Sequence, residues 1–258
     1  MRFVVFVKQV PDTMAVRLDG NGSLVRDGVP AILNPYCESA LSHILSIKNE
    51  GDTVAAVTMG PQKAADALRR CVELGADEAY LLSDRDFAGA DTWATSRALA
   101  AFVGKYEPDA DLYVFGRQAI DGDTGQVPYE VAGLLDVQQF AYVRALAKDG
   151  DTFTAVQDYE SFERAAKVPR RSVVSFGTVD PSGMLPTVEG YRRGKAAEIK
   201  VLGRVDIGLG LYSVGLKGSV TKIVGTDSVK AARRNMKVEI TDPNIAAELI
   251  IKERRAVG

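Results

Sequence analysis

The sequence predicts a doubly wound α/β fold with a mostly parallel sheet, added antiparallel strands and an extended C-terminal arm. In the first two thirds of the chain, short apolar runs alternate with amphipathic stretches, which is the pattern of parallel strands covered by helices. After residue 138, strand-like runs follow one another without long helices between them. Beyond Asp180, glycine and proline interrupt the sequence repeatedly, which predicts an extension beyond the compact domain.

Four apolar runs predict the parallel strands. The first, FVVFV at Phe3–Val7, is continuous and rich in β-branched residues, as expected of a strand buried on both faces. The other three lie at Thr53–Thr58, Ala79–Leu82 and Asp111–Phe115. Because helix-length segments separate these runs, each strand is expected to pair parallel with its neighbours.

Each predicted strand is followed by a helix with a recognisable start. Asn34 supplies an N-cap and Pro35 a first-turn proline for the first helix. We expect its His43 to be an ordinary exposed residue. The remaining helices are predicted to start at Gly60 with Pro61, at Asp91 as an N-cap, and at Gln126.

The second half of the chain predicts a different organisation. Phe140–Leu146, Thr152–Asp158 and Ser172–Phe176 are expected to be antiparallel strands at the sheet edge. A final helix is predicted at Asn244–Arg255. The arm that contains it is expected to gain its order from a partner.

Charge and apolar patterning exclude several partners and compartments. The 32 Lys and Arg residues nearly balance the 34 Asp and Glu residues, so neither nucleic acid nor a membrane surface is expected as the main partner. The N-terminal apolar run ends at Lys8, too early for a secretion signal or a membrane span. The sequence therefore predicts a cytoplasmic protein.

Residues that could perform catalysis themselves are scarce. The single histidine, His43, stands in mid-helix, which argues against a histidine-based triad or metal site. Cys37 and Cys71 share no metal-ligand spacing. We expect no catalytic side chain and no metal, and chemistry supplied by a bound cofactor fits this composition better.

The loops after the parallel strands are the expected ligand site, because open α/β sheets bind ligands outside the carboxyl ends of their strands. The richest of them, GRQAIDGDTGQV at 116–127, combines three glycines and capping side chains with a helix start. Such a loop either binds a phosphate through its backbone amides or forms a structural turn. The other loops are Lys8–Pro11, Met59–Gln62 and Ser83–Thr95.

Four motifs occur in order over about the first 145 residues: VKQVPDT, LNPYCE, VTMGPQKAADALRRCVELGADEA and GRQAIDGDTGQV. Together they resemble the beta subunit of electron-transfer flavoproteins. The resemblance implies an adenine-nucleotide α-hydrolase-like fold, with a nucleotide-binding domain at 1–180. It also implies that 181–258 forms a partner-recognition loop and an arm that docks on an alpha subunit.

The resemblance further implies an electron-carrier subunit that binds FAD or, alternatively, structural AMP. LLSDRDFAGADTWATS at 81–96 and DGDTGQ are similar to the bifurcating, FAD-binding subgroup. Such a subunit would take electrons from NADH, or work with an acyl-CoA dehydrogenase-like or other dehydrogenase, and would supply ferredoxin or flavodoxin. NADH-dependent flavin oxidoreductase activity is then expected of the complex. A stand-alone ATP- or AMP-binding stress-type sensor of the related fold is the other interpretation.

Residue by residue, the resemblance implies nucleotide contacts from two groups. The first comprises Phe6, Lys8, Asn34, Met59, Gly116, Arg117, Gln118, Ala119, Ile120, Asp121, Gly122, Asp123, Thr124, Gly125, Gln126 and Val127. For FAD, Asp91, Thr92 and Thr95 would join them. Packing or capping remains an alternative for Phe6, Met59 and Asp91.

Two segments depart from the family pattern. Val127–Glu130 stands where the bifurcating subgroup continues with Val-Gly-Pro-Glu, which alters the helix start. The dehydrogenase-recognition loop is expected at Met184–Gly194, but VDPSGMLP replaces its usual Asn-x-Pro-Arg-Tyr lead-in. Val188 is the expected apolar anchor of this loop.

Overall fold

The computed structural model describes residues 1–12, 17–18, 24–25, 30–179, 184–222, 242, 244–248 and 251. The chain divides into two compact units, Met1–Lys222 and Ile223–Gly258. In the second unit, residues 244–248 and 251 are helical, and the rest of the predicted helix Asn244–Arg255 lies outside the described residues.

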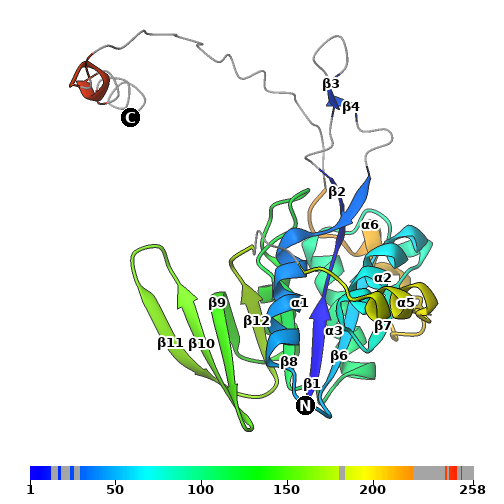
Figure 1. Cartoon of the computed structure of the whole chain (residues 1–258). Coiled ribbons are helices and arrows are strands. Elements are labelled where there is room, and N and C mark those ends of the chain that lie inside the picture. Colours follow the sequence, from blue (N-terminus) through cyan, green and yellow to red (C-terminus); the bar gives the residue numbers. More distant parts are fainter. Residues whose placement is uncertain are drawn as a thin grey trace. The chain divides into compact units, whose positions relative to one another are not determined.

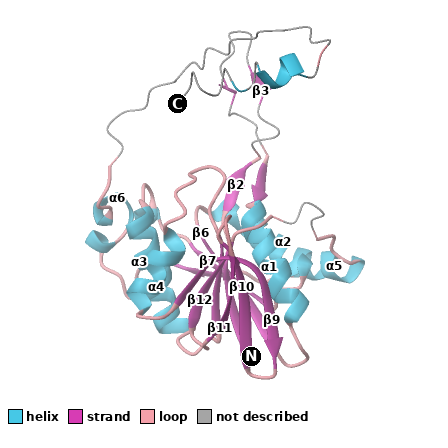
Figure 2. Cartoon of the chain, turned by 90° about the vertical axis from the view of Figure 1, so that its left-hand side faces the viewer, coloured by secondary structure: helices cyan, strands magenta, loops and turns pink. Residues whose placement is uncertain are grey.

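A nine-stranded sheet forms the centre of the first unit, with the order β11-β10-β9-β12-β8-β1-β6-β7-β13 (Figures 1 and 2). All neighbours from β9 to β13 in this order pair parallel, and β10 pairs antiparallel with both β9 and β11. The strands are β1 (Arg2–Phe6), β6 (Thr53–Met59), β7 (Glu78–Leu82), β8 (Leu112–Gly116), β9 (Gln139–Asp149), β10 (Thr152–Asp158), β11 (Glu163–Val168), β12 (Ser172–Phe176) and β13 (Lys200–Leu202).

Helices cover both faces of the sheet (Figure 2). The two faces of β1 show why: Phe3 and Val5 join the core with α1 (Pro35–Ile47) and α2 (Ala65–Leu74), while Val4 and Phe6 point to the other face. That second core includes residues of α3 (Thr92–Tyr106) and α4 (Val127–Leu135). The predicted doubly wound fold is confirmed.

Short elements complete the unit. The 3-10 turns are η2 (Gln62–Ala64), η3 (Arg85–Phe87) and η4 (Leu211–Ser213), and the remaining helices are α5 (Val188–Ala196) and α6 (Gly215–Gly218). Two further ribbons pair β2 (Gln9–Pro11) with β5 (Ala31–Leu33), and β3 (Arg17–Leu18) with β4 (Leu24–Val25).

Two predictions about single elements were wrong. Ser172–Phe176 is not an antiparallel edge strand, because β12 lies between β8 and β9 and pairs parallel with both. All five of its residues are buried, as in a central parallel strand. His43 is half-buried rather than freely exposed, and its ring stacks on Phe176 with the centroids 4.6 Å apart.

Glycines beyond residue 184 allow close helix packing rather than an irregular loop. Thr187 caps α5 by accepting the Gly190 N–H at 2.9 Å. A Cβ at Gly194 would lie 2.8 Å from the Arg69 carbonyl oxygen, and one at Gly190 would collide with the Glu73 carbonyl. The helix α5 therefore packs directly on the backbone of α2.

Candidate functional site

The carboxyl ends of β1, β6, β7 and β8 share one edge of the sheet, the upper edge in Figure 1, because these four strands are parallel and adjacent. The predicted site loops follow these strands. Strand geometry thus brings Lys8, Met59, Asp91 and the 116–127 loop to one end of the molecule.

Asn34 fixes the 116–127 loop through hydrogen bonds to its backbone. Its buried side chain donates from Nδ2 to the Gln118 carbonyl at 2.8 Å and to Cys37 Sγ at 3.1 Å. Its Oδ1 accepts the Ile120 N–H at 3.2 Å. Asn34 occupies the predicted N-cap position of α1, but its side chain does not cap that helix.

Lys8, two residues after the end of β1, reaches the same loop. Its ammonium lies 2.8 Å from Asp121 Oδ1, and both side chains remain partly exposed, at 47% and 30%. The Lys8 carbonyl also accepts the Asn34 N–H at 2.9 Å. The ion pair places a cation beside the loop and restrains the position of Asp121.

The loop itself is held by its own residues. A Cβ at Gly116 would lie 2.5 Å from the Tyr36 carbonyl carbon, so only glycine fits there. Asp123 and Gly125 adopt left-handed φ values of 53° and 62°. Gln118 Nε2 donates to the Asp123 carboxylate, and the Asp123 N–H donates to the Ala119 carbonyl at 2.8 Å.

The start of α4 lacks a side-chain cap, because Gln126 at the N-cap position makes no capping hydrogen bond. Left-handed residues in such a loop turn backbone N–H groups toward one side, which favours an anion. The arrangement suits a phosphate or pyrophosphate, with the Lys8 ammonium beside the loop as a cation.

Asp91 joins this site as a structural residue. Its Oδ1 caps α3 by accepting the Ala94 N–H at 2.8 Å, which confirms the predicted cap. Its Oδ2 accepts three hydrogen bonds, from Val220 and twice from Thr221. Burial raises the pKa of Asp91, but these hydrogen bonds outweigh it and hold the pKa below its usual value.

Thr92 links α3 to the start of α4. Its hydroxyl lies 3.1 Å from Gln126 Oε1 and 3.0 Å from Glu130 Oε1. Glu130 also accepts the Ser96 hydroxyl at 2.7 Å. The segments 81–96 and 116–127, which are far apart in the sequence, therefore meet at Thr92, whereas Thr95 is half-buried one turn further along α3.

Comparison with known proteins adds a family to this geometry. The family model described as "Electron transfer flavoprotein domain" matches residues 21–206. The chain belongs to this family, as a beta subunit. It is 40% identical to electron transfer flavoprotein subunit beta of Thermoanaerobacterium thermosaccharolyticum, over 90% of each chain.

Two further relatives come from reductase complexes. Caffeyl-CoA reductase-Etf complex subunit CarD of Acetobacterium woodii is 40% identical over 98% of this chain and 97% of its own. Acryloyl-CoA reductase electron transfer subunit gamma of Anaerotignum propionicum is 44% identical over 58% of each chain. This beta subunit is thus similar, over nearly its whole length, to a subunit of a reductase–electron transfer flavoprotein complex.

The remaining predicted contacts of this beta subunit lie in or beside the core. Phe6 is 4% exposed and stacks on Phe115 at 4.5 Å. Met59 is half-buried at the end of β6 and packs against the same core. Their predicted contact with a nucleotide stays a prediction.

In the described ranges, no helix has the length and apolar character needed to cross a membrane, and no metal-ligand cluster occurs.

Sequence reasoning missed two features beside the site. Ser219 and Thr221 contact Asp91 across 128 and 130 residues, a pairing without any sequence signal. Tyr142 lies on β9, and the Arg117 guanidinium lies over its ring at 5.2 Å. The tyrosine was visible in the sequence, but nothing there indicated its neighbour.

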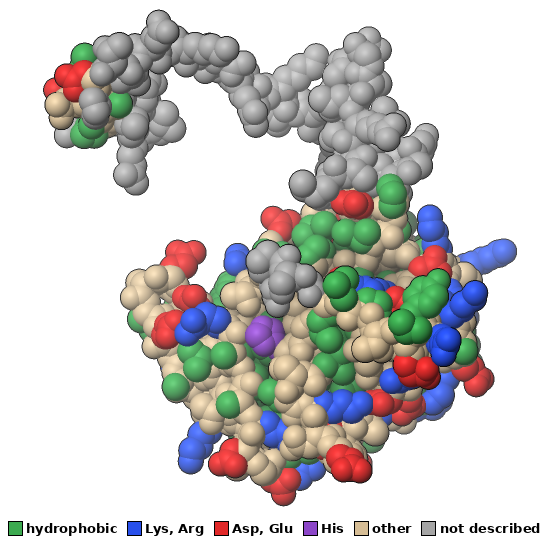
Figure 3. Space-filling view, viewed as in Figure 1, with side chains coloured by type: hydrophobic (Ala, Val, Ile, Leu, Met, Phe, Trp, Pro, Cys, Tyr) green, Lys and Arg blue, Asp and Glu red, His purple; other side chains and the backbone are tan. Residues whose placement is uncertain are grey.

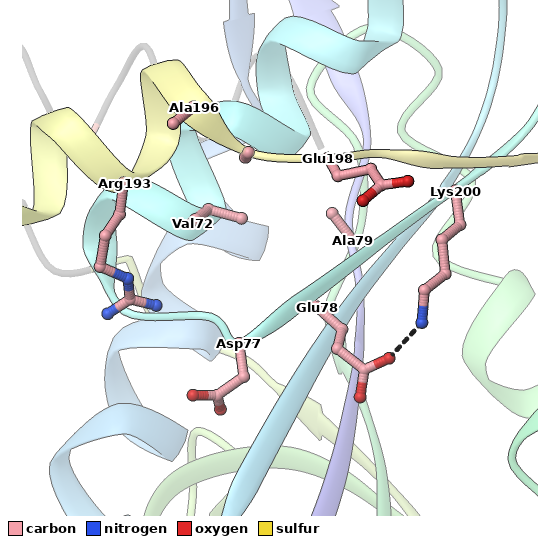
Figure 4. A pocket seen from close by; sticks show the side chains of 9 residues that line it. Val72, Asp77, Glu78, Ala79, Arg193, Ala196, Glu198 and Lys200 are labelled. Atoms are coloured by element: carbon pink, nitrogen blue, oxygen red, sulfur yellow. Dashed lines mark hydrogen bonds and ion pairs between the residues drawn. The ribbon is translucent and has the colours of Figure 1, made fainter.

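A pocket of about 400 Å³ lies at the opposite end of the sheet, at the amino ends of β7 and β13 (Figure 4). Glu78 and Lys200 form an ion pair of 2.7 Å on its wall. Its lining comprises Val72, Asp77, Glu78, Ala79, Arg193, Ala196, Ala197, Glu198 and Lys200. It contains none of the predicted nucleotide contacts.

Proposed function

We propose that this beta subunit binds FAD at the 116–127 loop and transfers electrons within a heterodimer with an alpha subunit. The observation that carries the proposal is the loop itself, tied to the carboxyl ends of β1 and β8 by Asn34 and Lys8. The donor set fits the phosphates of such a dinucleotide, because it combines backbone amides at a helix start with one ammonium group.

Structural AMP is the second candidate for the same loop, because an adenylate end alone would use the same phosphate contacts. FAD is favoured by the junction at Thr92. The two segments whose sequences resemble the bifurcating subgroup, 81–96 and 121–126, meet there through the contact between Thr92 and Gln126. The similarity over 98% of this chain to CarD, a subunit of a caffeyl-CoA reductase-Etf complex, supports a role in a complex of that kind.

Bound FAD would supply two-electron acceptance of a hydride from NADH and release of single electrons. The partners in this scheme would be the flavin-carrying alpha subunit and ferredoxin or flavodoxin. The residues of this chain do no redox chemistry in this scheme. Lys8 offsets phosphate charge, Asn34 orients the loop, and the buried strand ends exclude water on one side.

The dehydrogenase is proposed to dock on the segment 184–194. Leu185, Val188 and Tyr191 are 89%, 74% and 56% exposed. Hydrophobic side chains lie beside basic ones over α5 (Figure 3). Arg70 holds the start of this segment by donating to the Met184 carbonyl at 2.6 Å. An exposed apolar group on a fixed segment is suited to partner recognition.

Counting flavins per heterodimer tests the proposal. The chain is co-expressed with its alpha subunit, and flavin and AMP released from the purified complex are quantified. Two flavins per heterodimer and no AMP support FAD in the beta subunit, whereas one flavin and one AMP support the structural-AMP version. A colourless monomer containing AMP or ATP would instead support the sensor interpretation.

A further inference from the structure

Tyr142 has an unusual backbone conformation for an aromatic residue in a strand. Its φ is 52°, in the left-handed region that favours glycine. The register between β9 and β12 shifts at this point, since Val174 faces Phe140 but Phe176 faces Val143. Tyr142 is therefore in a bulge, where one strand has an extra residue and side chains are re-aimed.

Core packing does not explain why a tyrosine occupies this position. The side chain is 37% exposed, so the strained backbone does not serve to bury the ring. Gly177 lies close to the backbone of Tyr142, because a Cβ added at Gly177 would lie 3.1 Å from the Tyr142 Cα. A glycine would satisfy this bulge without strain, and strained backbone that persists is characteristic of ligand sites.

The ring of Tyr142 belongs to an open aromatic cluster. Tyr159 packs edge-on against it at 5.9 Å, and Phe162, which is 58% exposed, stacks on Tyr159 at 5.2 Å. The guanidinium of Arg117 lies over the Tyr142 ring at 5.2 Å. We call Arg117, Tyr142, Tyr159 and Phe162 the aromatic platform.

A buried amide positions the aromatic platform. Gln157 is 3% exposed and donates from Nε2 to the Tyr159 hydroxyl and to the Ala141 carbonyl, both at 2.8 Å. Its buried Oε1 has no hydrogen-bond partner among the residues that the structure describes. A buried, half-satisfied amide is unfavourable, and its presence beneath exposed rings indicates a positioning role.

The aromatic platform adjoins the proposed nucleotide loop. Arg117 follows Gly116 directly, and its N–H donates to the Phe176 carbonyl at 2.9 Å. The same residue thus joins the end of β8, the end of β12 and the ring of Tyr142. Planar guanidinium and tyrosine surfaces stack favourably on planar heteroaromatic rings.

We propose that the aromatic platform binds the planar heteroaromatic ring of a dinucleotide whose phosphates lie on the 116–127 loop. The inference rests on the proposed function. The ring in question is the one that is not adenine, and it has two sources, the isoalloxazine ring of FAD and the nicotinamide ring of NADH. AMP has the adenylate end but neither of these two rings. Its affinity therefore measures binding to the 116–127 loop alone, without a contribution from the platform.

The test titrates AMP, FAD and NADH into the full-length heterodimer after nucleotide is removed from the beta subunit. The variant is Tyr142→Gly, which removes the ring and relieves the backbone. We expect FAD affinity to fall about ten-fold, the magnitude of one lost stacking contact. AMP affinity and the thermal midpoint should not fall. Asp136→Gly is the control, because Asp136 has a matching φ of 52° at the end of α4.

Each outcome has a definite meaning. If Tyr142→Gly weakens NADH but not FAD, the platform binds the nicotinamide ring, and the proposal stands with that source. If neither affinity changes while AMP still binds, or if AMP affinity falls as much as the others because the platform holds adenine, the platform proposal is overturned and the nucleotide loop survives. If the wild-type heterodimer binds none of the three ligands, the proposed function itself fails.

Discussion

The carboxylate of Asp91 receives two hydrogen bonds from Thr221, one from its N–H at 2.8 Å and one from its hydroxyl at 2.9 Å. The other oxygen of Asp91 caps α3. One side chain thus holds both the start of α3 and residues 220–221, and the Asp91 N–H adds a hydrogen bond to the Ser219 hydroxyl. The next residue, Thr92, contacts Gln126 and Glu130 at the start of α4. The residues that Asp91 holds are therefore connected to α4 through Asp91 and Thr92.

Asp91→Ala should release residues 220–221 and destabilise the fold. The variant loses a helix cap and three further hydrogen bonds, so we expect the free energy of unfolding to fall by about 2–3 kcal/mol. Amide exchange at residues 219–221 should accelerate. Thr221→Val is the control, because it removes only the hydroxyl contact and should lower stability by about 1 kcal/mol. Equal effects of the two variants would show that neither the cap nor the two backbone hydrogen bonds from Val220 and Thr221 contribute to stability.

Acid should selectively remove the contribution of Glu78. Burial raises the pKa of Glu78, but hydrogen bonds with Lys200, Tyr80 and Arg2 outweigh it and bring the pKa from 4.5 to about 2. A carboxyl whose pKa is lower in the folded state stabilises the protein above its unfolded-state pKa. This contribution is therefore fully present above pH 4.5 and is lost as the pH falls toward 2.

Urea midpoints of wild type and Glu78→Gln measure this contribution. The difference between the two proteins should be constant from pH 7 to about 5 and should shrink on further acidification. Glu50→Gln, in the exposed turn before β6, shows what loss of a surface carboxylate does alone. A difference that grows in acid would contradict the assignment of the lowered pKa to Glu78.

Some elements of the fold were predictable from local pattern, and others depend on distant contacts. The run Phe3–Val7 is continuously apolar, and β1 is buried on both faces as expected. Ser172–Phe176 (SVVSF) contains two serines, yet all five of its residues are buried, and its pairing partners β8 and β9 are chosen by tertiary packing. Glycines 190 and 194 suggested irregular structure, because the backbone of α2 that they contact cannot be seen in the sequence.

The candidate site shows the same division. The 116–127 loop was recognisable from its glycines and capping residues and from the helix start behind it. The role of Asn34 was not, because its side chain bonds to Gln118, 84 residues away, instead of capping its own helix. Contacts at this separation have no periodic signature that a single sequence could reveal.

Gly194→Ala should separate α5 from α2. The added methyl group would lie 2.8 Å from the Arg69 carbonyl oxygen, which forces the helix outward. We expect a loss of about 1–3 kcal/mol in stability and weaker electron transfer with the dehydrogenase, since Val188 and Tyr191 would move with the helix. Gly133→Ala in α4 is the matched control, because a Cβ there meets nothing within 4 Å. That variant should gain about 0.5–1 kcal/mol.

Asp123 separates the two interpretations of the 116–127 loop. Its φ of 53° suits glycine, so Asp123→Gly keeps the turn while removing the carboxylate. If the carboxylate helps to hold the dinucleotide, the affinity of the beta subunit for flavin should fall about 10- to 100-fold, the magnitude of one charge-assisted hydrogen bond. The thermal midpoint should stay the same or rise.

Asp123→Ala adds the complementary measurement, because alanine removes the carboxylate and also strains the left-handed backbone. Flavin affinity should fall in both variants, and stability only in the alanine variant. Thr124→Ala changes the exposed neighbour without altering a left-handed position and should lower flavin affinity alone. Unchanged flavin content in the glycine variant would assign Asp123 to turn formation, through its contact with Gln118, and would leave phosphate binding to the backbone amides.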